Sequence, residues 1–157
     1  METRIKKVTY SFIFLAIIGF IDSLYLLTIH YLESPIYCSE FSDCNVVLNS
    51  EYATLFGIPI ALFGAIYYAF VLILSSLYLE KKKIKVLKVI AGVSIFGMIA
   101  SVRFVYLQAF VIYAFCDYCL LSAATSILIF IVAVYAYLKI FRQKNLSETV
   151  ANSPKSW

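Results

Sequence analysis

The chain has 157 residues, of which 63% are hydrophobic and only 14% are charged, whereas soluble domains are about 45–50% apolar and about 25% charged. This composition excludes an ordinary soluble fold, because a core of this size cannot bury so much apolar surface and a lipid bilayer is its natural solvent. The net charge of +4 does not predict nucleic-acid binding, because the Lys and Arg residues flank long apolar runs.

Four apolar stretches are long enough to cross a membrane, since a spanning helix needs about 20 mostly apolar residues. They are residues 8–30, 57–79, 86–114 and 118–140. The first follows basic residues as a signal peptide would, but it is too long and lacks a small-residue cleavage site, so we expect it to be retained. The sequence therefore predicts an all-α membrane protein. We expect a four-transmembrane-helix bundle over residues 1–145 and a polar cytoplasmic tail over 146–157.

The basic residues predict the orientation, because Lys and Arg concentrate in cytoplasmic segments next to the spans. All but Arg103 lie in the N-terminus, the 80–88 linker or the tail. Segment 31–56 has acidic residues but no Lys or Arg, and only Asp117 lies just before the fourth span. We therefore expect a multi-pass protein of the cell (plasma) membrane, with both termini cytoplasmic and the cysteines on the oxidising, extracytoplasmic side.

The longest connection, residues 31–56, contains many apolar side chains that would not stay in water. We expect a short amphipathic helix near 46–54 that lies in the membrane interface and caps the bundle from outside. Asn49 and Ser50 are expected to interrupt it. Pro59 is expected in the first turn of the second spanning helix, where its missing N–H group costs little.

Two charged residues, Asp22 and Arg103, lie deep inside predicted spans. A charge in a membrane is costly unless it is paired or faces an internal cavity. Counted along the helices at about 1.5 Å per residue, the two residues have similar depths, which predicts an ion pair between the first and third spans. His30 ends the first span and is expected to lie at the interface rather than to transfer protons.

Four cysteines form two pairs, Cys38 with Cys44 in the first outer segment and Cys116 with Cys119 in "CDYC" at the mouth of the fourth span. A C-x-x-C at a helix N-terminus favours the thiolate of its first cysteine, through free backbone N–H groups and the helix dipole. A second pair nearby would let electrons pass by thiolate exchange. Two structural disulfides or a four-thiolate zinc site are the alternatives, although the first spacing is unusual for zinc.

Two stretches, "CSEFSDCNVVLNSEYATLFGIPIALFG" (38–64) and "AFCDYCLLSA" (114–123), resemble the vitamin K epoxide reductase family in its bacterial and archaeal branch. The loop cysteine pair, the following serine, "FGIP" and "FG" at the second span, and the C-x-x-C occur in the same order. The resemblance implies a thiol:quinone oxidoreductase that supports disulfide-bond formation. A membrane quinone such as ubiquinone or menaquinone is the implied electron acceptor, and no metal is expected.

The resemblance also implies a role for each cysteine. Cys116 and Cys119 are the quinone-proximal disulfide, with Cys119 facing the quinone and Cys116 attacked from the loop. Cys44 is the shuttle that joins Cys116 transiently, and Cys38 meets the thiols of a partner. The implied partner is a separate thioredoxin-like (DsbA-like) thiol oxidase, since no such domain follows the fourth span.

Four residues match positions that line the quinone pocket in relatives: Ser50, Phe63, Tyr67 and Ile112. The Ser50 hydroxyl is expected to bond a quinone oxygen or a sulfur, or else to be an ordinary helix-end serine. Ile60 and Ala123 stand where the animal enzymes have an asparagine and a tyrosine that contact the vitamin. Oxidation by a respiratory quinone is therefore favoured over epoxide reduction.

Two other kinds of protein compete with this interpretation. A DsbB-like quinone-linked oxidase has similar topology and chemistry, but its C-x-x-C belongs to the first outer segment. A non-catalytic membrane scaffold with structural disulfides is the alternative from a different class.

Overall fold

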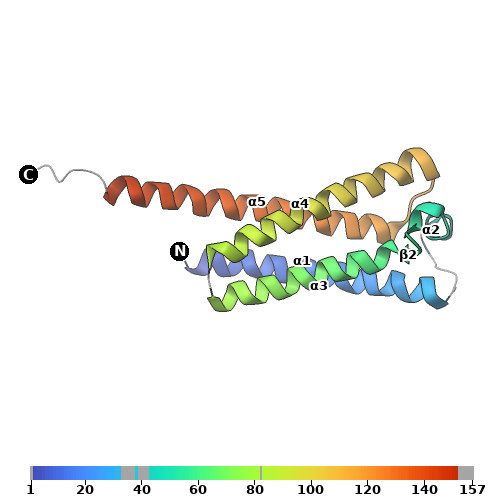
Figure 1. Cartoon of the computed structure of the whole chain (residues 1–157), viewed down its shortest axis with the longest axis horizontal. Helices are drawn as coiled ribbons and strands as arrows, with labels where there is room; N and C mark the ends of the chain where they lie inside the picture. The colour runs from blue at the N-terminus through green and yellow to red at the C-terminus, as the bar shows by residue number, and fades with distance from the viewer. Residues whose placement is uncertain (1, 33–37, 39–42, 82, 152–157) are drawn as a thin grey trace, which may run out of the picture.

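The computed structural model describes residues 2–32, 38, 43–81 and 83–151 of the chain, the side chains of 2–5, 81 and 140–151 excepted. Four long helices form a bundle (Figure 1): α1 (Glu2–Leu32), α3 (Ile60–Lys81), α4 (Ile84–Leu107) and α5 (Asp117–Ala151). Each contributes a stretch long and apolar enough to cross a membrane: Lys6–Leu32, Ile60–Glu80, Ile84–Ile112 and Asp117–Lys139. The predicted four-span helical bundle is therefore confirmed. The predicted domain boundary at 145 falls within α5, which continues to Ala151, and it stays a prediction.

The helices pack through faces of apolar and small residues. Helix α1 packs against α3 and α5, and α4 packs against α5 and α3. Phe12 and Ala16 on α1 meet Tyr68 and Val71 on α3 in the main core cluster, at the three- and four-residue spacing that places side chains on one helix face. Many large side chains on the opposite faces are exposed, as a lipid-facing surface requires.

Tyr68 joins two helices at the centre of the bundle. Its ring lies against Gly19 of α1, where there is no Cβ to displace it. Its hydroxyl donates a hydrogen bond to the Ser122 carbonyl on α5 at 2.6 Å and lies 2.9 Å from the Thr125 hydroxyl. Hydroxyl bonds between helices are one of the interactions that hold membrane bundles together.

The segment 44–59, which we call the cap, closes one end of the bundle. It contains α2 (Cys44–Leu48), the 3-10 helix η1 (Glu51–Ala53) and a hairpin of β1 (Thr54–Leu55) and β2 (Ile58–Pro59). The predicted helix over 46–54 is wrong in its bounds, whereas the predicted interruption at Asn49 and Ser50 is confirmed. The Asn49 side chain and the Ser50 hydroxyl bond back to the carbonyls of Asn45 and Val47, and the backbone of Ser50 is extended.

The hairpin was not predicted, and it shifts the start of the second span. Phe56 and Gly57 have φ values of 55° and 79°, and two such residues form the tight turn that joins neighbouring antiparallel strands. Pro59 consequently lies in β2 directly before α3, and not in the first turn of the helix.

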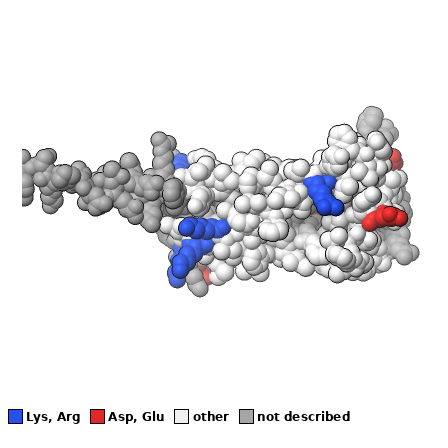
Figure 2. All heavy atoms as spheres, turned by 45° about the horizontal axis from the view of Figure 1, so that its top comes forward, with Lys and Arg blue, Asp and Glu red and all other residues white. Residues whose placement is uncertain are grey.

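Charged side chains are divided between the two ends of the bundle. Most basic side chains on the visible face gather at the end that holds the N-terminus and the α3–α4 connection, and most acidic ones lie at the cap end (Figure 2). One basic patch toward the cap end and a small acidic patch at the basic end are the exceptions on this face. The predicted ion pair of Asp22 and Arg103 is wrong. Asp22 is buried on the inward face of α1 with no hydrogen-bond partner among the described residues, while Arg103 is exposed. Similar depth was not enough, because the helical phase turns Arg103 away from the inward face that Leu87, Ile90 and Ser94 define.

Candidate active site: two cysteine pairs beside an apolar cavity

The cap brings the loop cysteine pair onto the start of α5. Cys38 and Cys44 form a disulfide with Cα atoms 6.2 Å apart, while Cys116 and Cys119 are free, buried thiols. Cys44, Cys116 and Cys119 belong to one buried cluster, and Cys38 packs against it. The four cysteines therefore lie together, as thiol exchange requires.

The redox state of the inner cysteine pair differs from the one that the resemblance implied. The resemblance implied a disulfide between Cys116 and Cys119, but this pair is in the dithiol form and the loop pair is oxidised. A relay of thiol exchange passes through this state once the loop pair has handed its electrons inward. Because Cys38 and Cys44 are bonded to each other, they do not supply thiolates for the zinc site that the spacing left open.

Helix α5 begins directly after Cys116 and fixes the geometry of the C-x-x-C. The backbone N–H of Cys119 donates a hydrogen bond to the Cys116 sulfur at 3.3 Å. A hydrogen bond from the Cys119 side chain is the largest effect that lowers the pKa of Cys116 below its ordinary value; burial opposes it, and backbone hydrogen bonds from Cys119 and Tyr118 add to it. Cys116 is thus an activated thiol, as its place at a helix N-terminus predicts.

Gln108 holds the backbone of Cys116 and was not singled out in the sequence. It begins the π-helical turn η2 (Gln108–Ile112), after which Tyr113 adopts a left-handed conformation with φ of 56°. The Gln108 side chain is fully buried, and its Oε1 accepts a hydrogen bond from the Cys116 N–H at 2.9 Å. The sequence does contain a signal for this role: Gln108 is a lone amide side chain near the end of an apolar span, and a buried polar group needs a hydrogen-bond partner.

Replacing Gln108 with leucine is expected to destabilise the protein by about 1–3 kcal/mol, because the buried N–H of Cys116 loses its acceptor. Thiol exchange at Cys116 should slow as well, since the backbone that positions the sulfur is no longer held. Gln108→Glu keeps an oxygen at the acceptor position and serves as the matched control. Thermal unfolding in detergent compares the three proteins; equal midpoints for the Leu and Glu variants would contradict this role.

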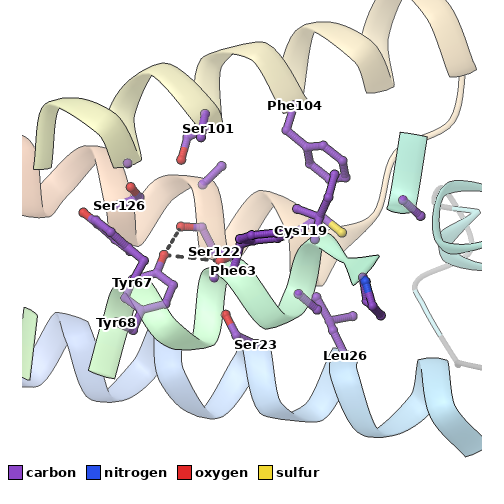
Figure 3. A pocket seen from close by; sticks show the side chains of 18 of the residues that line it. Ser23, Leu26, Phe63, Tyr67, Tyr68, Ser101, Phe104, Cys119, Ser122 and Ser126 are labelled. Atoms are coloured by element: carbon purple, nitrogen blue, oxygen red, sulfur yellow. Dashed lines mark hydrogen bonds between the residues drawn. The ribbon is translucent and has the colours of Figure 1, made fainter. Parts of the chain in front are cut away.

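A cavity of about 420 Å³ lies inside the bundle next to Cys119 (Figure 3), within the range of about 300–1,000 Å³ that is usual for small-molecule sites. All four long helices contribute to its wall, for example with Leu26 from α1, Phe63 from α3, Phe104 from α4 and Cys119 from α5. Of the cysteines, all four of which the structure describes, Cys119 is the one that lines the cavity.

Two hydroxyl groups on the cavity wall, those of Tyr67 and Ser126, are buried and make no well-formed hydrogen bond within the described structure. They are neighbours beside Gly97. A quinone is a flat apolar ring with two carbonyl acceptors, and it needs an apolar slot with a few unpaired donors. The residues present therefore fit a quinone, with Tyr67 and Ser126 as donors; Ser126 was not among the predicted site residues.

The predicted quinone-site residues fall into two groups. Phe63 and Tyr67 line the cavity. Ser50 and Ile112 do not appear on its wall: the Ser50 hydroxyl donates a hydrogen bond to the Val47 carbonyl at 2.7 Å, and Ile112 packs against the cysteine cluster. A quinone-binding role for these four residues stays a prediction.

Three further residues from the sequence analysis line the same cavity. Ile60 and Ala123, the positions that differ from the animal enzymes, both lie on its wall. His30 lies there too, half-buried at the end of α1. The cavity therefore has alkyl groups at the two positions where the resemblance led us to expect polar side chains in the animal enzymes.

The fold and the cysteines define a multi-pass membrane helical bundle with an activated C-x-x-C. The model of the Vitamin K epoxide reductase family matches residues 10–134, so the chain belongs to this family. Its members are membrane oxidoreductases that act on disulfides and quinones, and this chain is accordingly a membrane thiol–disulfide oxidoreductase linked to a quinone. Among curated proteins, none matches the chain.

Proposed function

We propose that this protein takes electrons from a separate thioredoxin-like thiol oxidase and passes them through its two cysteine pairs to a membrane quinone. The partner thereby becomes oxidised and able to introduce disulfides into other proteins. The observation that carries the proposal is the packing of Cys44 against Cys116 and Cys119, with Cys119 on the cavity wall.

The relay uses four thiol exchanges, each of which conserves bonds and electrons. A partner thiolate attacks Cys38 and opens the Cys38–Cys44 bond, and the second partner thiol completes the transfer by forming the partner disulfide. Cys44 then attacks Cys116 of the Cys116–Cys119 disulfide, which frees the Cys119 thiol. Cys38 attacks Cys44, restores the loop disulfide and leaves the Cys116–Cys119 dithiol beside the cavity. This last state has the same bonds as the structure.

The quinone, when bound, accepts two electrons and two protons from the dithiol. Tyr67 and Ser126 would hold it by donating hydrogen bonds to its oxygens, and the apolar wall would limit the access of water to the reacting sulfurs. Ser50 and Ile112 lie outside the cavity wall, and in this proposal they reach a bound quinone only from the side of the cap and the cysteine cluster. A respiratory quinone is the proposed acceptor, because alkyl side chains at 60 and 123 offer no polar group to an epoxide oxygen.

The proposed topology has the basic end of the bundle in the cytoplasm and the cap outside it. The charge division between the two ends supports this arrangement, because basic residues concentrate in cytoplasmic flanks. The cysteines then meet an oxidising compartment, where the loop disulfide persists.

The test is quinone reduction by the purified protein in detergent, with either a small dithiol or a reduced thioredoxin-like protein as electron donor. Wild type is expected to turn over with both donors. Cys38→Ala is expected to keep activity with the small dithiol, which reaches the inner pair directly, and to lose it with the protein donor. Inertness of wild type toward quinone would overturn the proposal, and equal use of both donors by Cys38→Ala would remove Cys38 from the relay.

A further inference from the structure

Asp22 is a buried carboxyl group that the relay does not use. It is 6% exposed, and neither carboxylate oxygen has a hydrogen-bond partner within the described chain. Ser23 and Leu26, its neighbours on the inward face of α1, line the cavity. A buried, unpartnered carboxyl in a spanning helix is costly, so packing alone gives no reason for an acid at this position.

The titratable groups that face Asp22 come from the two helices packed against α1. Tyr68 of α3 interacts with it electrostatically, as do Cys116, Tyr118 and Cys119 at the start of α5. None of these neighbours is basic. Gly19 and Leu26 lie about one helical turn from Asp22 on the same face of α1. The Tyr68 ring lies against Gly19, and Leu26 belongs to the buried cluster of Cys116 and Cys119. Asp22 therefore lies between Tyr68 and the reacting dithiol, with no basic group among the described neighbours named here.

The Tyr68 side chain lies between the neighbourhood of Asp22 and the cavity. Its hydroxyl lies 3.2 Å from the Ser122 hydroxyl and 2.9 Å from the Thr125 hydroxyl, and Thr125 in turn donates to the Ser122 carbonyl at 2.8 Å. Both Tyr68 and Ser122 line the cavity (Figure 3). Linked hydroxyl groups can pass a proton because each is both a donor and an acceptor.

We propose that Asp22 is the proton-transfer group of the thiol-to-quinone step, an inference that rests on the proposed function. In that step the Cys116 and Cys119 sulfurs form a bond, their two thiols lose two protons and two electrons, and the quinone gains both and becomes a quinol. Asp22 accepts the proton of the Cys119 thiol and passes one proton through Tyr68 and Ser122 to the cavity. The carboxyl is unchanged at the end of each turnover, and Cys116 supplies the second proton.

The test separates the two half-reactions in purified wild type, Asp22→Asn and Asp22→Glu. Asp22→Asn keeps the size of the side chain and removes a buried acid, so its unfolding midpoint in detergent is expected to equal or exceed that of wild type. Reduction of the Cys116–Cys119 disulfide by a small dithiol without quinone should be unchanged. Oxidation of the dithiol by an added quinone should slow by about 10²-fold, the lower end of the effect of a positioned acid or base, and its rate should lose the pH dependence that Asp22→Glu retains.

Glu51→Gln, which removes an exposed carboxylate from the cap, is the control and should behave as wild type. Tyr68→Phe should slow the quinone step in the same way as Asp22→Asn. Equal quinone-step rates and pH profiles for wild type and Asp22→Asn would overturn this inference while leaving the proposed function intact. Absence of quinone reduction in wild type would instead overturn the proposed function. If Asp22→Asn does not fold, Asp22→Glu and Tyr68→Phe are compared instead. The inference expects Asp22→Glu to keep the pH dependence of the quinone step and Tyr68→Phe to lose it, so indistinguishable pH profiles would overturn it.

Discussion

Replacing Cys119 with alanine is expected to reduce quinone reduction to background, a loss of more than about 10³-fold, as is usual when a covalent catalytic group is removed. Cys119 lines the cavity, and its backbone N–H holds the Cys116 sulfur at 3.3 Å. Without the second sulfur, the inner pair cannot form a disulfide and cannot deliver two electrons. The absorbance of an added quinone, with a small dithiol as donor, measures the loss.

The same variant should accumulate a disulfide between Cys44 and Cys116. These two residues share a buried cluster, and the Cys116 thiol can open the loop disulfide at Cys44. In wild type both Cys38 and Cys119 can release Cys44 from the mixed bond, whereas in the variant only Cys38 remains to do so. Mass spectrometry of non-reduced peptides detects the cross-link, and the double variant Cys44→Ala/Cys119→Ala is the control that should lack it. Persistent quinone reduction, or the absence of this cross-link, would contradict the proposed order of the cysteines.

Replacing Gly19 with alanine is expected to destabilise the bundle by about 1–3 kcal/mol, the usual cost of overpacking a core. A Cβ at this position would overlap the ring of Tyr68, which is 2% exposed. The ring cannot move aside easily, because its hydroxyl is bonded to Ser122 and Thr125 on α5. The expected result is a lower unfolding midpoint in detergent.

Gly92 supplies the matched control, since a Cβ there meets nothing within 4 Å. Gly92→Ala should leave stability unchanged or raise it, because alanine favours a helix over glycine by about 1 kcal/mol. Equal midpoints for the two alanine variants would show that Gly19 is not needed for the contact of α1 with α3.

The spans and the cysteine pairs were predictable because each depends on local composition. A stretch of about 20 apolar residues crosses a membrane whatever it packs against, and the C-x-x-C of Cys116 and Cys119 lies at a helix start that the apolar run defines. The cap was less predictable. Its apolar residues indicated burial, but the bonds of Asn49 and Ser50 back to α2 and the positive φ of Phe56 replaced one helix by three short elements.

Two parts of the site depended on information that periodicity does not carry. Depth along a helix placed Asp22 and Arg103 level with each other, whereas the rotation of each helix decides which face a side chain occupies. The acceptor role of Gln108 arises from a π-helical turn and a left-handed residue at Tyr113. Such turns are short interruptions of a helix and leave little trace in an apolar sequence.

Helix α5 extends beyond its membrane-spanning stretch at the basic end of the bundle. Its spanning stretch ends at Lys139, whose Nζ donates to the Tyr135 hydroxyl at 2.9 Å, and the helix continues for 12 residues to Ala151. At about 1.5 Å per residue, this extension is about 18 Å long, and Figure 1 shows it projecting past the ends of the other helices. The end of the helix at Ala151 therefore lies about this far beyond the end of the spanning stretch, so that a label attached after Ala151 is expected to lie away from the membrane surface.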